Sequence, residues 1–107
     1  MVASVAACAP ATAAPVRLTI ATAPGETLAF EPAETTVQAG GPIAITFRNG
    51  SSLTHNLVFT GVLTGATRTI VEPDASDEVH LAHPAPGVYP FACTIHEGMG
   101  GTLVVVD

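Results

Sequence analysis

The chain has 107 residues, a length typical of one domain, and 48% of them are hydrophobic, so a core can form without help from disulfides. Three arginines and no lysine stand against nine acidic residues, and this net charge of −6 excludes the basic patch that nucleic-acid binding requires. The sequence has no run of 18 apolar residues and therefore predicts no membrane-spanning helix.

The N-terminal segment predicts a flexible leader over residues 1–15, ahead of a single domain at residues 16–107. Its "VAAC" is similar to a bacterial lipobox, in which Cys8 would carry the lipid and tether the protein to a membrane. The seven residues before Cys8 are too few for the charged and apolar parts of a signal peptide. A lipoprotein tether and a plain alanine-rich tail both remain open, and both are compatible with a location outside the cytoplasm.

The rest of the chain consists of short segments that alternate apolar and polar residues between turn residues. The expected strands are residues 16–22, 26–32, 43–49, 55–61, 67–73, 77–83, 87–93 and 101–107. Turns recur about every 8 to 12 residues, which is typical of an antiparallel sandwich or barrel. Pro90 lies inside one of these strands and should face an edge or a bulge, because it has no N–H for a ladder hydrogen bond.

Three side chains that bind soft metals fall within the seven residues of "CTIHEGM": Cys93, His96 and Met99. Alternation along the preceding strand places Cys93 on the same face as Phe91, so its sulfur should point inward at the rim of the core. The glycine-rich loop that follows can fold tightly over an ion. His55 lies far upstream at the start of another expected strand, which an antiparallel fold can bring beside the end of the Cys93 strand.

Two imidazoles, one thiolate and one thioether form the donor set of blue-copper sites. A structural zinc site would instead have cysteine or histidine at all four positions. Nucleophilic catalysis by Cys93 with His96 is disfavoured, because the sequence places no acid to orient the histidine. The donor set therefore favours copper and does not indicate an enzyme.

Two long segments resemble the cupredoxin family, the type 1 copper proteins that include plastocyanin and amicyanin. They are "FEPAETTVQAGGPIAITFRNGSSLTHNLVF" and "APGVYPFACTIHEGMGGTLVVVD", and the resemblance covers residues 26–107. The Cys-x2-His-x2-Met spacing is similar to that of amicyanin. The resemblance implies an all-β fold, an antiparallel Greek-key sandwich of about eight strands.

The resemblance also implies roles for individual residues around one type 1 copper ion. The implied ligands are His55, Cys93 and His96 in the equatorial plane and Met99 in the axial position. Asn56 resembles the family asparagine that hydrogen-bonds to the residue after the cysteine, here Thr94, and joins the two ligand segments. Glu97 departs from amicyanin, which has proline there, and no role follows for it.

The expected function is one-electron transfer, with copper cycling between Cu(II) and Cu(I) and redox proteins docking near His96. The alternative is a periplasmic copper carrier or chaperone. We expect a monomer located outside the cytoplasm. His80 and His83 are interpreted as solvent-facing and turn residues. The same solvent-facing interpretation applies to four acidic residues around a turn: Glu72, Asp74, Asp77 and Glu78.

Overall fold

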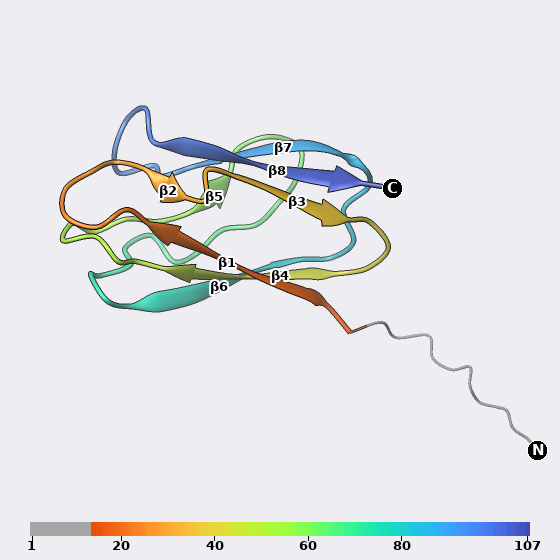
Figure 1. Ribbon diagram of the computed structural model, residues 1–107, viewed down its shortest axis with the longest axis horizontal. Helices are drawn as coiled ribbons and strands as arrows, with labels where there is room; N and C mark the ends of the chain where they lie inside the picture. The colour runs from red at the N-terminus through yellow and green to blue at the C-terminus, as the bar shows by residue number, and fades with distance from the viewer. Residues whose placement is uncertain (1–13) are drawn as a thin grey trace, which may run out of the picture.

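The computed structural model describes residues 14–107, which form two four-stranded sheets packed face to face (Figure 1). The strands are β1 (Val16–Thr22), β2 (Phe30–Glu31), β3 (Glu34–Gln38), β4 (Ile43–Arg48), β5 (Val58–Phe59), β6 (Ser76–Leu81), β7 (Gly87–Ala92) and β8 (Gly100–Val106). One sheet has the order β2-β1-β4-β6 and the other β3-β8-β7-β5. The predicted all-β sandwich of about eight strands is confirmed.

The predicted leader lies outside the described residues except for residues 14 and 15, and so does Cys8. Within residues 14–107, no helix has the length and apolar character needed to cross a membrane.

The two sheets are mixed rather than wholly antiparallel. β1 pairs with β4 in parallel, and β3 pairs with β8 in parallel, whereas β4–β6, β5–β7 and β7–β8 are antiparallel. The parallel pairs arise because the chain crosses from one sheet to the other after β2. β2 pairs with β1, whereas β3, which begins three residues after β2 ends, pairs with β8 in the opposite sheet. Alternation of apolar residues reports which face is buried but carries no information about strand direction.

Two of the expected strands are much shorter than predicted, and a third does not form. Residues 26–32 contribute only Phe30–Glu31, and residues 55–61 contribute only Val58–Phe59. Residues 67–73 form no strand, and this part of the chain makes two isolated bridges, Val71 with His55 and Ala66 with Val58.

Side chains explain why residues 67–73 do not form a regular ladder. The Thr67 hydroxyl accepts a hydrogen bond from the Leu57 N–H at 3.1 Å. The Arg68 N–H donates to the Asp77 side chain at 2.8 Å, not to the backbone of a neighbouring strand. Bonds from backbone N–H groups to side chains compete with a β-ladder, and the apolar pattern of the sequence does not reveal them.

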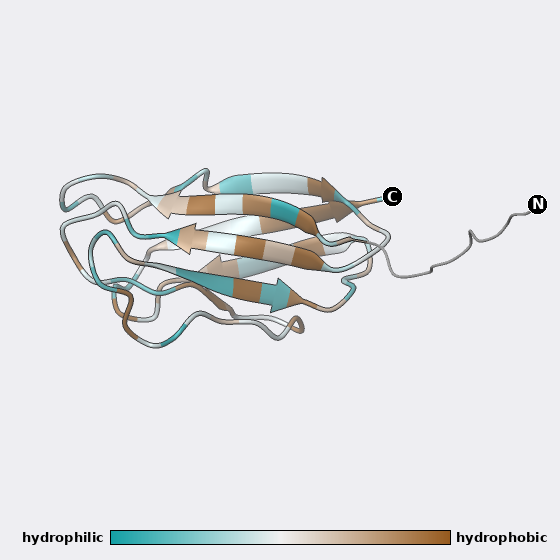
Figure 2. Ribbon diagram, turned by 90° about the horizontal axis from the view of Figure 1, so that it is seen from below, coloured by the Kyte–Doolittle hydropathy of each residue, from teal (hydrophilic) through white to brown (hydrophobic). Residues whose placement is uncertain are grey.

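The core lies between the inner faces of the sheets, and apolar and polar residues alternate along the strands (Figure 2). Four phenylalanines pack edge to face at its centre: Phe30, Phe47, Phe59 and Phe91, with ring centroids 5.0 to 6.1 Å apart. Phe91 pairs with Phe59 in the β5–β7 ladder. The aromatic cluster therefore supports the strand that leads into Cys93.

Pro90 lies where the β5–β7 ladder ends. Its carbonyl accepts a hydrogen bond from the Thr60 N–H at 3.2 Å, one residue beyond the end of β5. The N–H and C=O of a strand residue face the same neighbour, so the missing donor costs no bond within either ladder. β7 is an interior strand of its sheet, but Pro90 lies just beyond the last residue pair of its ladder with β5.

Gly101 of β8 allows the Phe91 ring and the Ala33 carbonyl to lie close to the backbone of this strand. A Cβ atom at this position would lie 2.5 Å from Cζ of Phe91 and 2.7 Å from the backbone oxygen of Ala33. The space is therefore already filled by a core ring and a backbone carbonyl.

We expect Gly101→Ala to lower the free energy of unfolding by roughly 1–3 kcal/mol, because the ring and the backbone must both shift. Gly61→Ala is the matched control, since its added Cβ would lie 3.7 Å from the Pro90 ring, an ordinary contact. Urea unfolding of the metal-free protein measures both variants. Equal losses for the two substitutions would contradict the packing argument.

Candidate metal centre

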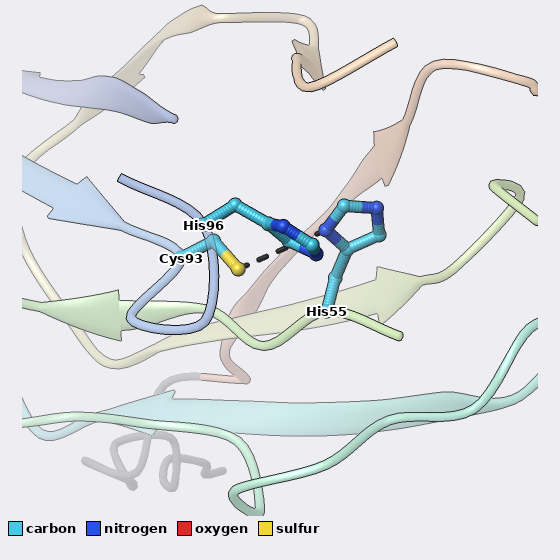
Figure 3. Close-up of side chains that lie close together, drawn as sticks. All are labelled: His55, Cys93 and His96. Carbon is cyan, nitrogen blue, oxygen red and sulfur yellow. Dashed lines mark hydrogen bonds between the residues drawn. The ribbon is translucent and has the colours of Figure 1, made fainter. Parts of the chain in front are cut away.

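Three potential metal ligands from two separate parts of the chain meet at one end of the sandwich: His55, Cys93 and His96 (Figure 3). Their ligand atoms all lie within 4.8 Å of one another. Cys93 directly follows β7, His96 lies in the β7–β8 loop, and His55 lies between β4 and β5. Within residues 14–107, no other group of three histidine, cysteine or acidic side chains lies close enough together to hold an ion.

His55 and Cys93 form the buried side of this group. His55 is fully buried and Cys93 is 4% exposed, and the Nδ1 atom of His55 lies 3.7 Å from the Cys93 sulfur. The Nε2 atom of His55 has no hydrogen-bond partner among the described residues. Burial lowers the pKa of His55 below its usual value, and the nearby His96 lowers it further. Both effects keep the imidazole neutral, which is the form that binds a metal.

His96 lies on the solvent side of the group and is partly exposed. Its Nε2 atom is 2.9 Å from the backbone oxygen of Thr54. A carbonyl oxygen only accepts, so Nε2 carries the proton and the neutral ring presents Nδ1 as its lone-pair donor. The His96 and His55 rings lie 4.7 Å apart between centroids.

The loop between β7 and β8 closes on itself. The Cys93 N–H donates to the Met99 carbonyl at 3.0 Å, and the Met99 N–H donates to the His96 carbonyl at 3.4 Å. Gly98 has a φ of +85°, a left-handed conformation that glycine adopts without steric cost. Met99 is 2% exposed and belongs to the core cluster, whereas Glu97 is exposed.

Asn56 and Thr94 join the two ligand-bearing segments by two hydrogen bonds. The Asn56 side chain donates to the Thr94 hydroxyl and accepts from the Thr94 N–H, both at 2.8 Å. The same amide nitrogen donates to the Thr69 carbonyl at 2.9 Å. These bonds fix the distance between the residue after His55 and the residue after Cys93.

The remaining charged residues singled out in the sequence lie away from this group. His80 is exposed on β6, with its Nε2 atom 3.1 Å from a Glu78 carboxylate oxygen, and His83 is exposed after that strand. Arg48 and Asp74 form a long, exposed ion pair at 4.0 Å.

Sequence reasoning did not identify Thr54 and Val71, which bond to the two histidines, or Asn49, which bonds to Val71. Thr54 and Val71 act through backbone carbonyls, which carry no sequence signal. Asn49 follows a strand and precedes glycine, so in the sequence it has the features of an ordinary turn residue, yet it is fully buried.

Comparison with known proteins identifies the family. The family model of the cupredoxin-like domain matches residues 1–105 of the sequence. The chain belongs to the cupredoxin-like family. No curated protein sequence matches it.

Solved cupredoxin structures match this fold over most of its length. The reduced auracyanin of Roseiflexus castenholzii is 28% identical, with a TM-score of 0.70 over 89% of this chain and 100% of that one. Auracyanin A of Chloroflexus aurantiacus, described as a "blue" copper protein, is 24% identical, with a TM-score of 0.71 over 86% and 99%. A reduced Cu(I) form of an amicyanin variant at pH 4 is 23% identical, with a TM-score of 0.65 over 87% and 85%.

Asp77 on β6 holds the segment that carries Val71 to its bridge with His55. Its two carboxylate oxygens accept from the Arg68 N–H and the Glu78 N–H, both at 2.8 Å. The hydrogen bond from the Arg68 N–H is the largest effect and lowers the pKa of Asp77 below its usual value. Burial opposes it, and the weaker effects of the Glu78 N–H and the Arg68 charge lower the pKa further.

A carboxyl group with a lowered pKa in the folded state stabilises the fold above the ordinary Asp pKa of about 3.9. This stability is lost as the pH falls through the lower folded value. We expect Asp77→Asn to cost about 1 kcal/mol at pH 7, because the amide offers only one acceptor for two N–H donors. We also expect the stability of this variant to fall less steeply between pH 5 and pH 3.

Urea unfolding of the metal-free protein across that pH range tests the prediction. Glu78→Gln is the matched control, because it removes the same charge from the adjacent residue of the same strand. Identical pH dependence in Asp77→Asn and the wild-type protein would refute the role of Asp77.

Proposed function

We propose that the chain is a type 1, or blue, copper protein that transfers single electrons between redox partners. The observation that carries the proposal is the convergence of one cysteine and two histidines at the end of a cupredoxin fold. His55, Cys93 and His96 are the proposed equatorial ligands, and Met99 is the proposed axial ligand.

The residues present fit such an ion. Neutral imidazole and thiolate are ligands that suit copper, and a weak axial thioether completes the set. His55 is buried next to the Cys93 sulfur with one ring nitrogen unpaired, an arrangement that a hydrogen-bonded core would not favour. When bound, copper in this donor set supplies a one-electron Cu(II)/Cu(I) couple.

The protein's own residues exclude water and hold the donor atoms in place. Burial of Cys93, His55 and Met99 keeps solvent from three of the four proposed donors. The bonds between Asn56 and Thr94 limit movement between the two segments. Fixed donors need little rearrangement when the charge of the site changes by one electron.

His96 gives the buried site its proposed route to a partner, because it is partly exposed while the other three donors are buried. Ile95 beside it is 36% exposed and Leu53 is partly buried. We propose that redox proteins dock briefly on this small apolar surface. The protein would act as a monomeric carrier, not an enzyme, outside the cytoplasm.

We expect Cu(II) added to the purified metal-free protein to produce an intense visible absorption band from sulfur-to-copper charge transfer. Cys93→Ser should abolish the band, because it removes the sulfur donor. His80→Ala is the matched control, since it removes a histidine that lies outside the site, and its colour should be unchanged. A colourless copper-loaded wild-type protein would rule out the type 1 assignment.

We expect Met99→Leu to keep the visible band and to raise the reduction potential, because a weak donor to Cu(II) is lost. Leucine has a similar volume and should preserve the packing of this buried position. Protein-film voltammetry compares the variant with the wild-type protein. An unchanged potential would show that Met99 is not the axial ligand.

The alternative is a periplasmic copper carrier, which needs an exchangeable site. Burial of His55, Cys93 and Met99 argues for retention of the ion. Transfer of Cu(I) to a competing chelator separates the two functions, since rapid release would favour the carrier.

A further inference from the structure

Asn49, the first residue after β4, uses every hydrogen-bonding group that it has. Its side-chain oxygen accepts from the Thr22 hydroxyl and from the Ser51 N–H, both at 2.9 Å. Its side-chain nitrogen donates to the carbonyls of Leu53 at 2.8 Å and Val71 at 2.9 Å. An asparagine side chain offers two donor hydrogens and two acceptor positions, so the capacity of this fully buried residue is exhausted.

The backbone of Asn49 is bonded as completely as its side chain. Its N–H donates to the Ala75 carbonyl at 2.9 Å, and its carbonyl accepts from the Asp74 N–H at 2.8 Å. Asn49 therefore connects the end of β1, the turn before β6 and the segment that leads to His55. A residue that joins several segments can determine where a metal-binding side chain lies, even when it does not contact that side chain.

One connection from Asn49 reaches His55 through Val71. The Val71 carbonyl that accepts from Asn49 also accepts from the His55 N–H at 3.2 Å. In return, the Val71 N–H donates to the His55 carbonyl at 2.9 Å. The backbone of His55 is thus held by a residue that Asn49 itself holds.

A second connection reaches His96 through the adjacent peptide unit. Asn49 holds the carbonyl of Leu53, and the next carbonyl along the chain, that of Thr54, accepts from Nε2 of His96. The Leu53 N–H is also fixed, by donation to the Ser51 hydroxyl at 3.0 Å. The carbonyl that sets the orientation of the His96 ring is therefore one peptide unit away from a carbonyl that Asn49 holds.

We propose that Asn49 is a positioning residue for both histidines of the metal centre. It contacts neither imidazole and acts through the carbonyls of Val71 and Leu53. The part of the proposal that concerns copper rests on the proposed function, but the positioning of His55 and Thr54 is a property of the metal-free protein.

Thr22 allows the proposal to be tested without replacing the buried amide. It is the last residue of β1 and is 3% exposed. Its hydroxyl donates to Asn49 and accepts from the N–H groups of Gly50 at 2.9 Å and Ser51 at 3.1 Å. Thr22→Val removes these bonds with little change of shape, and Thr22→Ser keeps the hydroxyl.

The first measurement is amide hydrogen exchange in the metal-free protein. We expect Thr22→Val to speed amide exchange at His55 and Val71 by roughly two- to tenfold, the factor that corresponds to the loss of one hydrogen bond. Thr22→Ser should exchange at close to the wild-type rate. Faster exchange confined to Gly50 and Ser51, which lose their acceptor directly, would overturn the proposal.

The second measurement is the affinity for Cu(I), determined by competition with a chelator. We expect Thr22→Val to bind Cu(I) more weakly, by up to roughly tenfold, because it removes one of the hydrogen bonds that hold Asn49. Thr22→Ser should restore the affinity. Unchanged affinity in Thr22→Val would also overturn the proposal.

Val105→Ala is the control for general destabilisation. Val105 is 2% exposed near the far end of β8, so this variant should lower stability without changing copper affinity or exchange at His55. An equal loss of affinity in Val105→Ala and Thr22→Val would refute positioning by Asn49. A wild-type protein without the visible copper band would overturn the proposed function alone, since the exchange measurement needs no metal.

Discussion

The hydrogen bonds between Asn56 and Thr94 are the interaction on which the metal centre depends. β5 and β7 are joined by only two residue pairs, Val58 with Ala92 and Phe59 with Phe91. Continued toward the site, that antiparallel register places residue 56 opposite residue 94. Beyond the last backbone pair, the Asn56 side chain forms the hydrogen bonds between the two segments. These bonds extend the alignment of the strands to the position of the proposed metal ligands.

This arrangement brings together donors that lie 38 residues apart in the sequence, while each keeps a different environment. His55 and Cys93 are buried with the core, and the aromatic cluster lies beneath them. His96 remains in contact with solvent and is oriented by a backbone carbonyl. The same fold thus gives a dry interior for the donor atoms and a single partly exposed ring at the surface.

The sequence indicates much of the site, because its features are local. The spacing of Cys93, His96 and Met99 can be read directly, and alternation with Phe91 correctly placed the cysteine on the inner face. His55 was a candidate because an antiparallel fold can bring the start of its strand beside the end of the Cys93 strand, and the family resemblance supplied its neighbour Asn56. The all-β class also follows from short alternating segments between turns.

Other features could not be predicted, because they depend on partners remote in the chain. Parallel and antiparallel strands have the same alternation, so the mixed pairing of β1 and β3 left no signal. Residues 67–73 have the pattern of a strand but form none, because the N–H of Arg68 donates its hydrogen bond to the Asp77 carboxylate. Asn49 has the sequence context of a turn residue, and its burial depends on Thr22, which lies 27 positions earlier.

The closed β7–β8 loop also has a kinetic consequence. Three of the four proposed donors lie within seven residues whose two ends are bonded to each other, Cys93 to Met99. One local opening of this loop would separate three donors from His55 together, while both sheets stayed folded. The residence time of a bound ion would then follow the opening equilibrium of this short segment, not the unfolding of the whole domain.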